Sequence, residues 1–179
     1  MFEFFRFELR QQLRSPLLWL MGALFALFAF GGASSDAIQI GGSVGNVHRN
    51  APMVAVQFLG VFTLMGMLFT AMAINGALLR DFEQGTAELI FASPIKRRDY
   101  VAGRIAAAIV GCLAIYALIG FGIFVAQFMP WIDAARLGPV SLYPYVWAFA
   151  VVVLPNLLFT AALLSLLAIV TRSILWVYI

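Results

Sequence analysis

Long runs of hydrophobic residues alternate with shorter polar segments along the 179-residue chain. Four runs predict membrane-spanning helices, at residues 17–33, 53–79, 105–128 and 146–170. The runs are continuous and do not alternate with period two, so they favour helices over the strands of a membrane barrel. We therefore expect an all-α fold, a polytopic bundle of transmembrane helices. Residues 174–179 begin a further apolar run, which we interpret as the start of a truncated fifth span.

Residues 1–15 precede the first span and predict an amphipathic helix. Apolar side chains recur on one side, and basic side chains line the adjacent side at Arg6, Arg10 and Arg14. Such a helix would lie along the membrane surface with its arginines on lipid phosphates. A signal peptide is the alternative, with residues 17–30 as its apolar region, but the length and the two glutamates of the leader favour its retention.

A polar and basic segment, residues 83–104, joins the second and third predicted spans. Gly85 and Thr86 can end the long second helix and begin a short one, with Glu88 near its start, where the helix dipole favours a carboxylate. Pro94 ends the short helix, because the residue before a proline is pushed out of helical geometry. The expected coupling segment is therefore residues 83–98, and a solvated re-entry loop is the alternative.

Two groups of side chains within and beside this segment have different expected roles. The first would contact a partner protein: Glu83, Gly85, Thr86, Glu88, Leu89, Ile90, Phe91 and Pro94. The second is basic and would meet lipid headgroups, together with the arginines of the leader: Lys96, Arg97, Arg98 and Arg104. A partner that presses on this segment would move both neighbouring spans.

The basic residues are distributed unequally between the two sides of this four-span arrangement. Nine of the 11 lysines and arginines fall on one side: Arg6, Arg10, Arg14, Arg80, Lys96, Arg97, Arg98, Arg104 and Arg172. The positive-inside rule then places the N-terminus and residues 83–98 in the cytoplasm. We expect a multi-pass protein of a bacterial inner membrane.

Composition and motifs argue against an enzyme. The chain is 64% hydrophobic and 11% charged, with a mean hydropathy of +1.00, as in integral membrane proteins. Lys96 follows no glycine-rich phosphate loop, and a lone His48 with a lone Cys112 offers no zinc or triad chemistry. We expect no catalytic, cofactor or metal site in this chain, and no nucleic-acid partner.

Two features inside the predicted spans bear on how the helices pack. Gly103, Ala107 and Gly111 repeat every four residues, which predicts a small-residue seam that another helix can approach closely. Pro155 and Asn156 interrupt the fourth span near its middle, where the proline frees a backbone carbonyl. An interhelical hydrogen bond from Asn156 is the favoured interpretation, and a polar site on a substrate path is the alternative.

The stretch RDFEQGTAELIFASPIKRRDYVAGR resembles the signature between the second and third spans of type-2 ABC transporter permeases. The matching positions are Glu83, Gly85, Thr86, Glu88, Leu89, Pro94, Arg97, Gly103 and Arg104. The resemblance implies a permease domain in the lipid bilayer, paired with a second permease half. It also implies that residues 83–98 dock on a separate ATP-binding subunit, which holds the ATP.

The rival interpretation is a multi-span membrane anchor for a catalytic domain beyond residue 179. Some large bacterial permeases that are similar at this end continue into a metallopeptidase region. An anchor needs neither a coupling segment nor polar groups within its spans, and this sequence has both. The anchor therefore ranks second.

Overall fold

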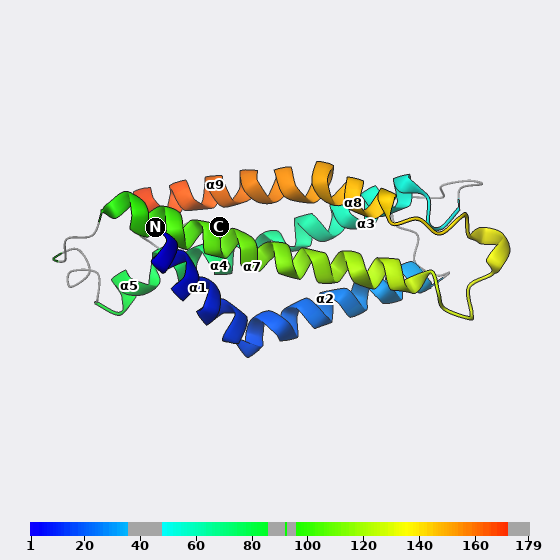
Figure 1. Cartoon of the computed structure of the whole chain (residues 1–179), viewed down its shortest axis with the longest axis horizontal. Helices are drawn as coiled ribbons and strands as arrows, with labels where there is room; N and C mark the ends of the chain where they lie inside the picture. Colours follow the sequence, from blue (N-terminus) through cyan, green and yellow to red (C-terminus); the bar gives the residue numbers. More distant parts are fainter. Residues whose placement is uncertain (36–47, 86–91, 93–95, 172–179) are drawn as a thin grey trace. The chain divides into compact units, whose positions relative to one another are not determined.

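The computed structural model describes residues 1–35, 48–85, 92 and 96–171 (Figure 1). Helices of different length supply the regular structure of this described part, and it contains no strand, which confirms the all-α prediction. The elements in chain order are α1 (Phe2–Arg14), α2 (Pro16–Ser34), α3 (Pro52–Met65), α4 (Met67–Leu78), α5 (Arg80–Glu83), α7 (Arg97–Ala126), η1 (Ala134–Arg136), α8 (Tyr143–Ala148), η2 (Phe149–Val153) and α9 (Leu154–Thr171). The predicted fifth span at 174–179 lies outside the described residues.

Within the part of the chain that the structure describes, three helical stretches are long and apolar enough to cross a membrane: Pro16–Ser34, Arg97–Ala126 and Tyr143–Thr171. A fourth span results if α3 and α4 are counted together. The amphipathic pattern of the leader corresponds to α1, which ends at Arg14; Ser15 caps it, directly before the proline that opens α2. The chain is thus a multi-pass membrane protein.

The second predicted span differs from the expectation of one helix over 53–79, because the helix is interrupted at Gly66. Glycine weakens a helix by its conformational freedom. Two threonine hydroxyls beside the break also bond to backbone carbonyls, Thr63 to Gly60 O at 2.6 Å and Thr70 to Gly66 O at 3.2 Å. Such side-chain bonds compete with the helical hydrogen-bond pattern and bend helices.

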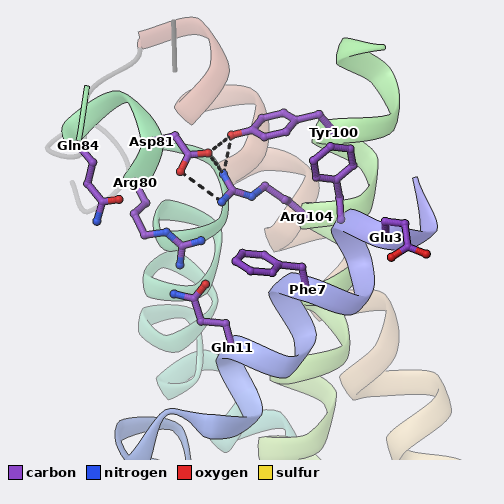
Figure 2. A pocket seen from close by; sticks show the side chains of 9 residues that line it. Glu3, Phe7, Gln11, Arg80, Asp81, Gln84, Tyr100 and Arg104 are labelled. Carbon is purple, nitrogen blue, oxygen red and sulfur yellow. Dashed lines mark hydrogen bonds and ion pairs between the residues drawn. The ribbon is translucent and has the colours of Figure 1, made fainter. Parts of the chain in front are cut away.

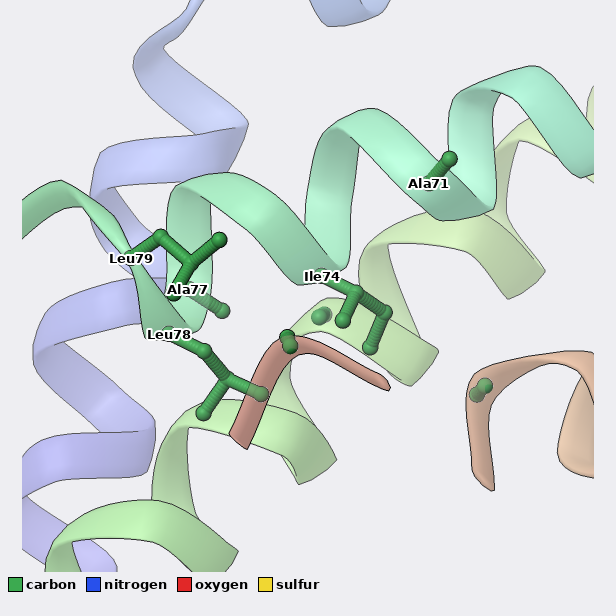
Figure 3. Packing of buried hydrophobic residues seen from close by; sticks show 8 residues of the cluster. Ala71, Ile74, Ala77, Leu78 and Leu79 are labelled. Atoms are coloured by element: carbon green, nitrogen blue, oxygen red, sulfur yellow. The ribbon is translucent and has the colours of Figure 1, made fainter. Parts of the chain in front are cut away.

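The chain forms two compact units. Unit 1 contains Met1–Leu18, Gly66–Leu113 and Leu157–Ile179, and unit 2 contains Trp19–Met65 and Ala114–Asn156. The core of unit 1 combines residues of α4, α7 and α9 with Leu79 (Figure 3): Ala71, Ile74, Ala77, Leu78, Leu79, Ala108, Ala161 and Ala168. Alanine dominates this cluster, and small side chains let helix backbones approach closely in a membrane.

Unit 2 also depends on a small residue at a close helix contact. A Cβ atom on Gly122 of α7 would lie 2.5 Å from the carbonyl oxygen of Ala26 in α2, so only glycine fits there. The ring of Phe25 packs edge-on against Phe62 of α3 at 6.2 Å between centroids. These contacts join α2, α3 and α7 within the unit.

Arg49 caps the C-terminal end of α2 from a turn that is distant in sequence. Its guanidinium donates to Ser34 O at 3.4 Å and to Ser35 O at 2.8 Å. A cation at this end of a helix is favoured by the carbonyls that lack an intrahelical donor. The neighbouring Asn50 donates to Gly138 O at 2.9 Å and accepts from Gly138 N at 2.8 Å. These two hydrogen bonds hold the residues just before α3 against the chain at Gly138.

The helix that contains Pro155 is not broken there. It begins at Tyr143, three residues before the predicted start of the fourth span, and runs to Thr171 through the π-helical turn η2. Proline removes the N–H that would bond to the carbonyl of Val151, and its ring crowds that carbonyl. The wider turn just before Pro155 accommodates this local loss of helical hydrogen bonding.

Candidate functional site

A cluster of buried charged side chains joins α1, α5 and α7 within unit 1. Glu8 of α1 is only 2% exposed. Its Oε2 atom accepts a hydrogen bond from Arg80 Nη2 at 3.0 Å and lies 3.2 Å from Arg104 Nε. One carboxylate oxygen therefore holds two guanidinium groups, one from α5 and one from α7.

Asp81 of α5 supplies the second carboxylate of this cluster. Its Oδ2 atom lies 2.5 Å from Arg104 Nη1, and its Oδ1 atom accepts from Arg104 Nη2 at 3.4 Å. Tyr100 donates its hydroxyl hydrogen to Asp81 and accepts from Arg104 Nη1 at 2.5 Å, as the dashed lines in Figure 2 show. Among the described side chains, two carboxylates thus face two guanidiniums, and their charges balance. That balance offsets the large cost of removing charges from water.

A cavity of about 600 Å³ adjoins the cluster. Phe7 and Gln11 line it from α1, Arg80 and Gln84 line it from α5 and the residue after it, and Tyr100 lines it from α7 (Figure 2). On the α1 side, the ring of Phe4 packs edge-on against that of Tyr100 at 5.5 Å between centroids. The cavity wall therefore combines aromatic rings with hydrogen-bonding groups.

The local sequence explains why α1 can reach this cluster. Tyr100, Gly103, Arg104, Ala107 and Gly111 follow helical spacing on one side of α7. A Cβ atom on Gly103 would lie 2.7 Å from Met1 O and 3.0 Å from Phe4 Cβ, so glycine is needed for the close approach of α1. The small-residue seam thus accommodates α1, and the contact at Gly103 brings Glu8 next to Arg104.

The predicted partner-contact residues fall mostly outside the described residues: Thr86, Glu88, Leu89, Ile90, Phe91 and Pro94. Of Glu83 only the backbone is described, as the last residue of α5. Gly85 has a φ of 67°, in the left-handed region that glycine adopts readily. That conformation ends the helical path after α5.

Most of the predicted membrane-surface residues are exposed: Arg6, Arg10, Arg14, Lys96, Arg97 and Arg98. Their contact with lipid headgroups stays a prediction. For Arg104 the prediction is wrong, because this side chain is only 4% exposed and is held by Glu8 and Asp81. Two nearby carboxylates inside the protein provide the counter-charge that lipid phosphates were expected to provide.

Asn156 donates a hydrogen bond from Nδ2 to Oγ1 of Thr63 at 3.4 Å. This bond joins α9 to α3 within unit 2, as the favoured interpretation of Asn156 predicted. The side chain of Asn156 and the neighbouring Pro155 are otherwise exposed on the protein surface. A role for them in a substrate path stays a prediction.

Sequence reasoning gave no role to Glu8, Arg80, Asp81 or Tyr100 in a shared site. The sequence around Glu8 could have indicated its role, because Glu8 is an acid between two basic residues of the leader, Arg6 and Arg10. An acid at such a position is unfavourable at an anionic lipid surface, so it points to a partner inside the protein. The identity of that partner required the fold.

Comparison with protein families gave a match over residues 4–174 to the family described as ABC-2 family transporter protein. Neither the comparison with curated proteins nor that with solved structures gave a match. The family match covers most of the chain, and it agrees with the permease resemblance found from residues 83–104. The chain therefore belongs to the ABC-2 transporter family, as a membrane permease domain.

Proposed function

We propose that this permease domain couples ATP hydrolysis, performed by separate ATP-binding subunits, to the movement of a substrate across the membrane. The chain would work beside a second permease half and hold no nucleotide or catalytic group itself. Its N-terminus and residues 83–98 would face the cytoplasm of a bacterial cell, and the spans would lie in the inner membrane. The ATP-binding subunit would dock on residues 83–98.

The observation that carries this proposal is the ion pair between Asp81 and Arg104. Asp81 lies just before residues 83–98 and Arg104 lies just after them, so the pair links both flanks of the proposed docking segment. Arg104 Nη1 and Asp81 Oδ2 are 2.5 Å apart, and both side chains are buried. A force applied to the segment would therefore act on α5 and α7 together.

Cysteine crosslinking tests the docking. With Cys112 replaced by Ser, Glu88→Cys and Phe91→Cys would be introduced singly into the permease in native membranes that contain its ATP-binding subunit. We expect both cysteines to capture the ATP-binding subunit, and we expect ATP to change the yield. The matched control is Ala135→Cys, in a segment that the sequence places on the opposite side of the membrane.

The two outcomes lead to different functions. Nucleotide-sensitive capture at Glu88→Cys or Phe91→Cys, with none at Ala135→Cys, would support the coupling role. If neither position captures the subunit, although a membrane-impermeant maleimide reaches both from the cytoplasmic side, the coupling proposal fails. The membrane-anchor interpretation would then take first place.

A further inference from the structure

Glu8 is the most buried charged side chain among the described residues, at 2% exposure. It belongs to a helix whose arginines on either side of it, Arg6 and Arg10, are exposed. The carboxylate lies next to two guanidiniums, of which Arg104 is also held by Asp81. Glu8 is thus the point at which α1 is joined to an ion-pair network that already connects α5 and α7.

We propose that Glu8 is a positioning residue that makes α1 move together with the two flanks of residues 83–98. The inference rests on the proposed function. It adds α1 to α5 and α7 as a third helix that moves when the ATP-binding subunit acts on residues 83–98. Displacement of α5 would pull on Arg80, and displacement of α7 would pull on Arg104. In the ion-pair network, both displacements would act on the same atom of α1, the Oε2 oxygen of Glu8.

The ion pairs of Glu8 are better suited to fixing the alignment of α1, α5 and α7 than to adding stability. Apolar contacts already hold α1 to α7, through Gly103 and through the edge-on pair of Phe4 and Tyr100. A buried ion pair often contributes no more stability than well-packed apolar residues of similar volume. Its directional hydrogen bonds do, however, favour one alignment of the elements that carry the charges. At Glu8 those elements are α1, α5 and α7.

Dipolar broadening in continuous-wave electron paramagnetic resonance, which reports short distances, can test whether α1 moves with α7. Spin labels would be placed at Leu13 of α1 and Val110 of α7, which are 40% and 39% exposed, in a Cys112→Ser background. The complete transporter would be reconstituted in lipid nanodiscs and measured without nucleotide and after incubation with ATP and vanadate, which traps ADP and vanadate after hydrolysis. The readouts are the width of the Leu13–Val110 distance distribution and the nucleotide-induced change in the Leu13 spectrum.

We expect a narrow distribution in the unsubstituted protein, in both nucleotide states. Glu8→Gln should broaden it and reduce the nucleotide-induced change at Leu13 at least about fivefold, in the range seen when coupling residues are altered. Glu3→Gln is the matched control, because it neutralises an exposed carboxylate of α1 that lies outside the Glu8 ion pairs. If Glu8→Gln and Glu3→Gln give the same width and the same nucleotide response, the inference is overturned.

A milder variant keeps the test decisive if Glu8→Gln does not fold. Arg80→Gln removes one partner of Glu8 but leaves Arg104 in place, and it should give an intermediate broadening. A width equal to that of the unsubstituted protein would contradict the inference. Failure of the proposed function is recognised separately, because it would abolish nucleotide-sensitive capture at Phe91→Cys without affecting the nucleotide-free distance distribution.

Discussion

Arg104 and Asp81 are joined by a contact of 2.5 Å between Nη1 and Oδ2, although the two residues lie on opposite flanks of residues 83–98. Arg104 also reaches Glu8 at 3.2 Å, so it is the member of the cluster shared by both carboxylates. Within unit 1, this one guanidinium connects the leader helix to the chain on both sides of the proposed docking segment.

Replacement of Asp81 by Ala should destabilise the protein, because it leaves Arg104 buried with only one of its two carboxylates. Breaking a buried ion pair from one side typically costs about 3–5 kcal/mol. Thermal unfolding in detergent, followed by the reactivity of buried Cys112 toward a fluorescent maleimide, would report the loss. Asp81→Glu retains the charge and should cost less, whereas equal losses for the two variants would show that charge is not the cause.

Gly103→Ala should loosen α1 from α7, because its new methyl group would meet Met1 O at 2.7 Å. Overpacking of this kind typically costs about 1–3 kcal/mol. Gly120→Ala, in the same helix, is the control, since a Cβ atom there meets nothing within 4 Å. It should stabilise by roughly 0.5–1 kcal/mol through a gain in helix propensity. The same unfolding measurement would compare the two, and a harmless Gly103→Ala would refute the close approach of α1.

The hydrogen bond between Asn156 and Thr63 should contribute modestly to stability. A double-mutant cycle with Asn156→Leu and Thr63→Val should give a coupling energy of about 0.6 kcal/mol, the average for such bonds between membrane helices. Two features keep it small: the donor and acceptor are 3.4 Å apart, and Thr63 also bonds to Gly60 O. A coupling energy well above about 2 kcal/mol would indicate that Asn156 takes part in a larger polar network.

Side-specific labelling of single cysteines tests the proposed orientation. With Cys112 replaced by Ser, Arg98→Cys should react with an impermeant maleimide only after the cells are opened. Ala135→Cys should react in intact cells, because the excess of basic residues places residues 83–98 in the cytoplasm and residues 130–145 outside. Both native side chains are exposed. The reverse labelling pattern would invert the topology and remove residues 83–98 from reach of a cytoplasmic ATP-binding subunit.

The hydrophobic pattern was sufficient to predict the fold class, and the motif between Glu83 and Arg104 indicated the family, but neither determined which helices pack together. The spacing of Gly103, Ala107 and Gly111 indicates which face of α7 is small, and it does not say which helix covers that face. The structure shows that α1 lies against Gly103. The break at Gly66 was missed for a related reason, since hydropathy is continuous there and does not register that threonine hydroxyls compete for helical carbonyls.

The buried cluster was harder to predict, because counting the basic residues on each side of the membrane treats every arginine alike. Arg98 and Arg104 are six positions apart and contributed equally to the predicted orientation, yet one is exposed and the other is buried. The difference depends on Glu8 and Asp81, which lie far from Arg104 in sequence and meet it only in the folded chain. Tertiary contacts of this kind leave no periodic signal.

The contact between Arg49 and the last carbonyls of α2 has a practical consequence for protein engineering. The guanidinium of Arg49 donates to Ser35 O at 2.8 Å, so the two residues at the ends of the intervening chain are held together. Lengthening a closed loop is inexpensive, at about 0.6 kcal/mol for each doubling of its length. An epitope tag or a fluorescent reporter inserted within residues 41–46 should therefore leave the ends of α2 and α3 in place.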